Sequence, residues 1–158
     1  MKKFAAVCLS FMLLLSLTAC GAKDDTLGGM LKNDFTESVE KNENISAQEL
    51  ADRICANENI PFEMVSMPVE PGVLMGFNEI EITGFKEAVQ FSPMIGTVPF
   101  LGYIFVLEDE TDVNDFIDIL TANANPRWNI CTEAEETMVT SVGNHVFFLM
   151  SPKDTDLV

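Results

Sequence analysis

Residues 100–107 have the sequence FLGYIFVL, an apolar run that only Gly102 interrupts. Aromatic and β-branched residues dominate this run, a pattern typical of a central strand that is buried on both faces. An acidic cluster, Glu108-Asp109-Glu110, ends the strand and leads to Thr111, a suitable helix N-cap. Apolar residues at helical spacing then predict an amphipathic helix over 112–123.

A second amphipathic helix is predicted nearer the N-terminus. Ser46 is a suitable N-cap, and Glu49, three residues later, completes a capping box. Apolar residues recur on one face as far as Cys55, and the helix is expected to end near residues 57–59. Cys55 is therefore expected to point toward the core, where a free cysteine behaves as a small apolar residue.

Two β-type runs, residues 137–142 and 145–150, flank Gly143-Asn144 and predict a tight hairpin. A two-residue loop fixes the register, so Val142 should oppose His145. In this register Ser141 lies on the other sheet face, which excludes a Ser141–His145 catalytic dyad. His145 follows the turn directly, a position where a polar side chain commonly meets solvent. A structural role is therefore expected for His145.

Segment 60–97 is ambiguous. Its pattern predicts strands at 62–67 and 85–91. Between them it predicts a turn at 70–72 and either a strand or a short helix at 77–82. The order of elements indicates an α+β fold, with a mainly antiparallel sheet and two helices packed on one face as a two-layer sandwich. Because the central strands are apolar on both faces, the second face must be covered by segment 60–97 or by a partner.

The first 20 residues resemble a bacterial lipoprotein signal. Lys2 and Lys3 precede an apolar segment, residues 4–17, that is too short to cross a bilayer comfortably. Leu17-Thr18-Ala19-Cys20 follows the lipobox pattern of an aliphatic residue, two small residues and a cysteine. The resemblance implies lipidation of Cys20 through its sulfur, with acyl groups such as palmitate, and cleavage before it. An ordinary secretory signal cut near Ala19, or an uncleaved short anchor, are the alternatives.

The predicted organisation has four parts. They are a signal peptide (1–19), a lipid-anchored flexible tether (20–45), a single α+β domain (46–152) and a C-terminal tail (153–158). A coil of about 25 residues would reach roughly 25–30 Å and lift the domain clear of the bilayer. Three apolar residues of the tether share a helical spacing and allow a transient helix: Leu31, Phe35 and Val39.

The charge balance excludes several partners. Without residues 1–19, seven basic and 25 acidic side chains remain, a formal charge of −18. Nucleic acid binding needs clustered basic residues, and anionic lipid headgroups repel an acidic surface. The acidity indicates either a well-solvated surface, which we favour, or a cationic partner.

From about Met94 to Met150, over a third of the chain, the sequence resembles an uncharacterised family of small lipoproteins from Gram-positive bacteria. The resemblance is carried by Ser92-Pro93-Met94, the apolar strand that ends in acids, the 112–123 helix, Asn125-Pro126-Arg127-Trp128-Asn129-Ile130-Cys131 and the Val142-Gly143-Asn144 turn. It implies the anchored architecture and no known activity.

Candidate metal sites are weak. Asp112-x-Asn114 begins like a calcium loop, but the third ligand and the glycine are missing, so helix capping is the better interpretation. Methionines at 64, 67, 75 and 94 could bind a soft metal, although core packing is favoured. We predict no metal and no cofactor.

For Trp128 we favour a semi-exposed side chain that caps the end of the second helix; with Arg127 it is still the best candidate contact surface, which could stack on a ligand such as a sugar. The sequence favours a lipid-anchored, extracytoplasmic, non-enzymatic binding or assembly module of the bacterial cell envelope, with another envelope protein as the expected partner. The alternative is a small envelope enzyme using Cys131 with His145. No disulfide between Cys55 and Cys131 is expected.

Overall fold

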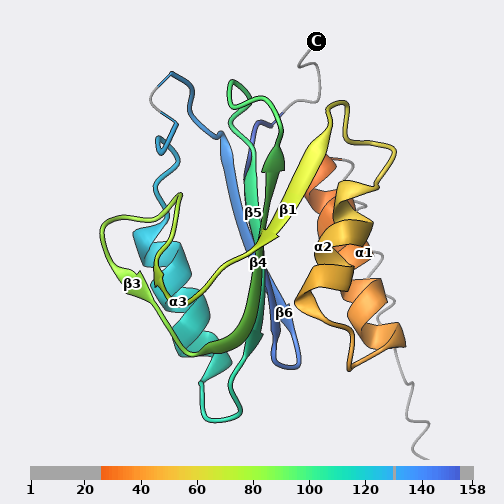
Figure 1. Ribbon diagram of the computed structural model, residues 1–158, viewed down its shortest axis with the longest axis vertical. Coiled ribbons are helices and arrows are strands. Elements are labelled where there is room, and N and C mark those ends of the chain that lie inside the picture. The colour runs from red at the N-terminus through yellow and green to blue at the C-terminus, as the bar shows by residue number, and fades with distance from the viewer. Residues whose placement is uncertain (1–25, 130, 154–158) are drawn as a thin grey trace, which may run out of the picture.

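A computed structural model describes residues 26–129 and 131–153 of the chain. Five strands form one sheet: β1 (Met64–Pro68), β4 (Phe85–Pro93), β5 (Leu101–Leu107), β6 (Glu136–Val142) and β7 (His145–Ser151). Their order is β1-β4-β5-β7-β6, and every neighbouring pair is antiparallel. The predicted α+β class and antiparallel sheet are confirmed (Figure 1).

The apolar run at 100–107 supplies the middle strand, as predicted. Every residue of β5 is buried, so the strand has no solvent-facing side. Gly102 is the one small residue in it and pairs with Phe91 on β4. A Cβ atom at Gly102 would overlap the ring of Phe91, so the glycine provides the space in which that aromatic ring lies over β5.

One face of the sheet is covered by α1 (Leu27–Lys41) and α2 (Ala47–Cys55), which lie side by side (Figure 1). The helix α1 corrects the predicted tether over 20–45. Residues 27–41 are part of the folded domain, and their apolar side chains are buried in its core.

The burial of one apolar stripe explains why α1 forms in an otherwise polar segment. Leu27, Leu31, Phe35 and Val39 follow each other at intervals of four residues and are all buried. Phe35 stacks on Phe147 of β7, with 5.5 Å between ring centroids. Isolated helices of this length are marginal in water, so packing on the sheet supplies most of the stability of α1.

The predicted start of α2 is confirmed. The Ser46 hydroxyl accepts a hydrogen bond from the backbone N–H of Glu49, over 3.1 Å. The capping box is only half formed, because the Glu49 carboxylate accepts from Arg53 on the next turn. Cys55 is half-buried against the core between α2 and the sheet, consistent with the predicted inward direction.

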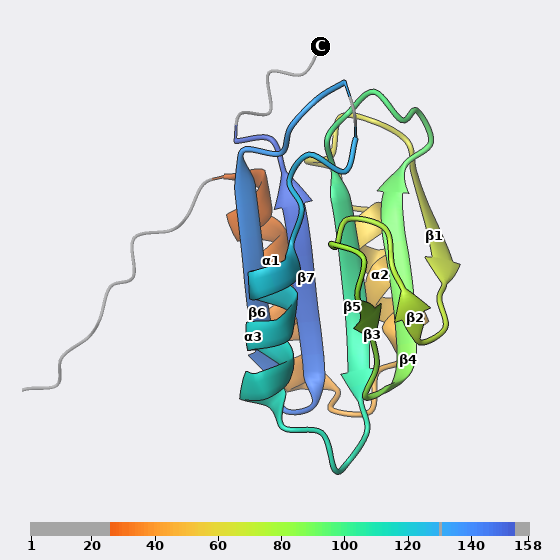
Figure 2. The ribbon, with the colours of Figure 1, turned by 90° about the vertical axis from the view of Figure 1, so that its left-hand side faces the viewer.

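The opposite face of the sheet is covered by α3 (Val113–Asn123) and by the segment that carries β2 (Gly72–Val73) and β3 (Glu81–Ile82) (Figure 2). The two predicted helices, α2 and α3, therefore pack on opposite faces rather than on one. The expectation that segment 60–97 helps to cover the second face is confirmed, since Leu74, Phe77 and Ile82 are buried there.

The helix α3 begins one residue later than predicted. Asp112 is its N-cap and accepts hydrogen bonds from the N–H groups of Asn114 and Asp115. Thr111, the predicted cap, instead donates its hydroxyl to the carbonyl oxygen of Gly84. The acids near this helix thus act in capping, as the sequence favoured over a calcium loop.

The β6–β7 hairpin has the predicted register. Val142 pairs with His145 and Ser141 with Val146. His145 is not at solvent, however: it is only 3% exposed, and its Nε2 lies 2.8 Å from the carbonyl oxygen of Ile45. The loop between α1 and α2 covers this end of β7, so the imidazole is part of the core.

None of the helices in the described residues is long and apolar enough to cross a membrane. Beyond Lys153, the predicted C-terminal tail lies outside the described residues.

Candidate functional site

The side chains that line the best candidate site come from four separate segments. They surround an open groove of about 460 Å³ on the α3 side of the sheet. We call it the methionine groove and define it by six of its lining residues: Met67, Met75, Gln90, Met94, Leu101 and Trp128. No charged residue lines it. An apolar concave surface of this kind is the usual form of a binding site.

Three methionines form the rim of the groove. Met67, Met75 and Met94 are 48%, 57% and 62% exposed, so the core packing predicted for them is wrong. Met64 does pack in part against the core under α2. Methionine side chains are flexible and polarizable, and exposed methionines recur on surfaces that adapt to apolar partners.

The strand register explains where the groove lies. Met67 pairs with Gln90, Gln90 with Tyr103, and Tyr103 with Phe148, so these side chains form one row across a single face of the sheet. Phe77 covers the inner part of this row, with ring centroids 4.7 Å from Phe148 and 5.7 Å from Tyr103. The outer part of the row, Gln90 and Met67, lines the groove, with the buried Gln90 at its floor.

A buried hydroxyl fixes the rim to the floor. The Tyr103 hydroxyl lies 2.8 Å from the carbonyl oxygen of Met75 and 2.9 Å from Oε1 of Gln90, and can donate to either. Tyr103 is fully buried, and this burial raises the pKa of its hydroxyl, so it stays protonated. The bond therefore holds the backbone at Met75 over the sheet at any ordinary pH.

The other walls of the groove are also tied together. Asn129 donates its side-chain amide to the carbonyl oxygen of Gly96, over 2.6 Å, which joins the loop after α3 to the β4–β5 loop. The N–H of Asn125 donates to the carbonyl oxygen of Gly76, over 2.8 Å, which joins the same loop to the segment of Met75. The groove is thus held in shape before any ligand binds, which lowers the entropic cost of binding.

The two residues predicted as a contact surface separate in the structure. Trp128 lines the groove and is half-buried, with part of its side chain packed under α3. Arg127 is exposed and lies outside the lining, with its Nε 3.6 Å from a carboxylate oxygen of Glu133. Of the two predicted contact residues, only Trp128 lines the groove, and the other large side chains around it include methionines from distant segments.

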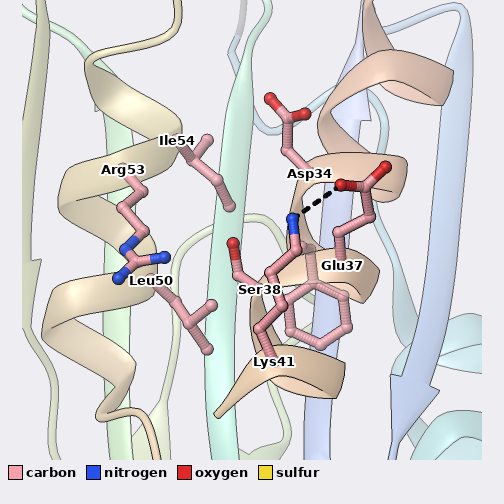
Figure 3. A pocket seen from close by; sticks show the side chains of 8 residues that line it. Asp34, Glu37, Ser38, Lys41, Leu50, Arg53 and Ile54 are labelled. Carbon is pink, nitrogen blue, oxygen red and sulfur yellow. Dashed lines mark hydrogen bonds and ion pairs between the residues drawn. The ribbon is translucent and has the colours of Figure 1, made fainter.

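A second hollow, of about 240 Å³, lies between α1 and α2 (Figure 3). Its charged side chains already have partners: Lys41 pairs with Glu37 over 2.9 Å, and Arg53 pairs with Glu49 over 2.8 Å. The hydrogen bond from Lys41 and its charge lower the pKa of Glu37. We interpret this hollow as the solvent-facing seam of two packed helices and not as a ligand site.

The alternative catalytic pair, Cys131 and His145, is not brought together. The N–H of Glu135 bonds to the carbonyl oxygen of Ser151, so the loop with Cys131 lies beside the far end of β7 from His145 (Figure 1). The six residue steps along β7 from His145 to Ser151 span about 20 Å, and this length separates the imidazole from the loop with Cys131. In addition, His145 bonds to Ile45 on the α1–α2 side, whereas the loop that carries Cys131 follows α3, which packs on the other face.

The remaining predicted sites have simple outcomes. Cys55 and Cys131 are both free thiols, as predicted. Burial, followed by the charge of Asp52, raises the pKa of Cys55 to about 11. Among the described residues, no three His, Cys, Asp or Glu side chains are grouped so that they could hold a metal ion.

Sequence reasoning found Trp128 but missed the groove around it. The groove depends on the pairing of β1 with β4, which puts Met67 beside Gln90 and which no local pattern in the sequence signals. The predicted lipidation site, Cys20, lies outside the described residues. Comparison of the chain with protein-family models, with curated proteins and with solved structures finds no match.

Proposed function

We propose that this protein is a lipid-anchored, extracytoplasmic, non-enzymatic binding module of the bacterial cell envelope, and that the methionine groove is its binding surface. The lipobox at Leu17-Thr18-Ala19-Cys20 supports the anchor and the location. The separation of Cys131 from His145 argues against the enzyme that the sequence offered as an alternative.

The observation that carries the proposal is the gathering of three exposed methionines and the only tryptophan of the chain around one uncharged groove. Exposed apolar side chains that are scattered singly need no explanation, but a concave group of them marks a contact site. Tryptophan is enriched among the residues that dominate binding energies, because it buries a large area with few rotatable bonds.

The occupant we propose is an apolar segment of another envelope protein that has basic residues beside it. The groove offers apolar contacts and no charge of its own, so it suits a few apolar side chains. The mature chain around it carries a formal charge of −18, which attracts basic partners and repels acidic ones. Charges outside the direct contact raise the rate of association more than the final affinity.

The experiment is site-specific photo-crosslinking in intact membranes with the full-length protein. A photoreactive phenylalanine analogue replaces Met67 or Met75 in the groove, and in the matched control it replaces Ile119 of α3. Ile119 is also exposed and apolar, at 45%, and does not line the groove. We expect one protein adduct from both groove positions, weakened at high salt, and none from Ile119.

A second variant tests whether the groove itself makes the contact. Met94→Asp places a charge on the rim at an exposed position, so it should leave thermal stability nearly unchanged and abolish the adduct from Met67. Equal adducts from all three positions, or an adduct that survives Met94→Asp, would contradict the assignment of the groove as the binding surface.

A further inference from the structure

The sheet has one end that lies near the predicted lipid anchor. Gly28, in the first turn of α1, lies against Met138, Leu149 and Ser151. Ser151 is the last residue of β7, and its neighbour Met150 pairs with Leu101, the first residue of β5. The start of α1 and the β4–β5 loop are therefore at the same end of the domain, which is the upper end in Figures 1 and 2.

The chain between the anchor and the domain is short. Five residues separate Cys20 from Thr26, the N-cap of α1, and a fully extended chain from one to the other spans at most about 20 Å. The tether of about 25 residues that the sequence predicted would have allowed more. Because α1 belongs to the domain, a lipid on Cys20 holds this end of the sheet close to the bilayer surface.

The β4–β5 loop projects from that end and carries two adjacent exposed apolar side chains. Met94 is 62% exposed and Ile95 is 70% exposed, the highest exposure among the large apolar residues described. No residue from 88 to 107 is charged, so the loop and the adjoining parts of β4 and β5 carry no charge. A charged residue beside the tip is the exposed Glu63, whose carbonyl oxygen accepts from the N–H of Met94. An apolar tip on a rigid hairpin is suited to the boundary between headgroups and acyl chains.

We propose that the tip of the β4–β5 loop, Met94 and Ile95, enters the interface of the bilayer that holds the lipid anchor. The proposal rests on the lipidation of Cys20 in the proposed function. An anchor at Cys20 holds the chain to the membrane at one point only, so a second contact is needed to set the orientation of the domain. The tip supplies that second contact and fixes the orientation of the domain, with the sheet standing away from the membrane.

The acidic surface determines the form of this contact. A chain with a formal charge of −18 is repelled by anionic headgroups and does not lie flat on them. A hairpin tip enters with only its uncharged end, and the rest of the domain stays in solution. This orientation also leaves the methionine groove beside the membrane surface, because Met94 is part of its rim.

The test uses full-length mature protein reconstituted into phosphatidylcholine vesicles that contain lipids brominated on the acyl chain. Trp128→Phe removes the only tryptophan, and Ile95→Trp then places one at the tip. The matched control is Val73→Trp in the same background. Val73 is 64% exposed and lies on β2, where it pairs with Glu81. Three residues after Glu81, the carbonyl oxygen of Gly84 accepts from the N–H of Glu108, just past the opposite end of β5.

We expect strong bromine quenching and a blue-shifted emission for the tryptophan at position 95, and neither for the one at position 73. Adding Met94→Asp should remove the quenching while the protein stays in the vesicles. Lipidated protein, shown by mass, whose tryptophan at position 95 is not quenched would overturn the membrane contact alone. Protein without lipid on Cys20 would overturn both this contact and the anchor of the proposed function.

Discussion

The two faces of the sheet are covered in different ways. On the α1–α2 face, two helices lie along the strands, and the side chains beneath them form one continuous buried cluster. On the other face, α3 covers the β6–β7 side and the β2–β3 segment covers part of the rest, and the corner above Gln90 stays open. The difference indicates that one face serves stability, while the open corner of the other is available for binding.

The sharpest test of this comparison pairs a substitution on each face. Phe147→Ala empties a fully buried site that Phe35 and Phe91 both contact, so it should lower the free energy of unfolding by about 3–5 kcal/mol. Met67→Ala on the groove rim should cost less than about 1 kcal/mol, because Met67 is nearly half exposed. Urea unfolding of both variants measures the two values. Similar losses would show that the groove is part of the core.

A smaller loss of stability is expected when His145, the only histidine of the chain, is replaced. His145→Ala leaves the carbonyl oxygen of Ile45 buried without its partner, which should cost about 1–3 kcal/mol. His145→Gln keeps a hydrogen-bonding side chain at the site and should recover part of that loss. Neither variant should change the crosslinking from the groove, which lies at the other end of the sheet. A stable His145→Gln protein that fails to complement deletion of the gene would revive a catalytic role.

The smallest effect on the fold is expected from the two thiols, Cys55 and Cys131, which should differ clearly in their rates of alkylation. With a pKa of about 11, only about one part in a thousand of Cys55 is thiolate at pH 8, so iodoacetamide should modify the exposed Cys131 first. Peptide mass mapping over time measures both rates.

The same shift has a consequence for stability at high pH. The pKa of Cys55 is higher in the folded state than its ordinary value of 9.0, so the neutral thiol favours folding. That contribution is complete below about pH 9 and is lost as the pH rises toward 11. Cys55→Ala should remove this part of the alkaline destabilisation, and an unchanged pH profile would contradict the cause assigned to it.

Local signals in the sequence predicted the parts of the fold that depend on neighbouring residues. Gly143-Asn144 fixed the hairpin register, and Ser46 marked the start of α2. The helix α1 was missed because its polar composition and Gly28-Gly29 give a low helix propensity, which burial against the sheet overrides. The strands β2 and β3 are two residues each, too short for any periodicity to appear.

The candidate site was predicted less well than the fold, because its lining residues come from segments that are far apart in the sequence. Trp128 was singled out as an aromatic residue beside Arg127 that could stack on a ligand, but its neighbours in the groove come from three other segments. Those segments meet only through β1–β4 pairing and through the crossing of the β2–β3 segment over the sheet. Nothing local in the sequence encodes either contact.

The hydrogen bonds that hold the groove also determine when it can exist during folding. They join Gly96 to Asn129 and Gly76 to Asn125, across 33 and 49 positions of the chain respectively. Contacts of such long sequence separation form late, because the loops between them must close first. The groove therefore exists only in a chain whose strands β1, β4 and β5 and the segment after α3 have all come together. If the groove binds a partner as proposed, that partner recognises only molecules that have completed folding, so that binding itself discriminates finished domains from incomplete ones.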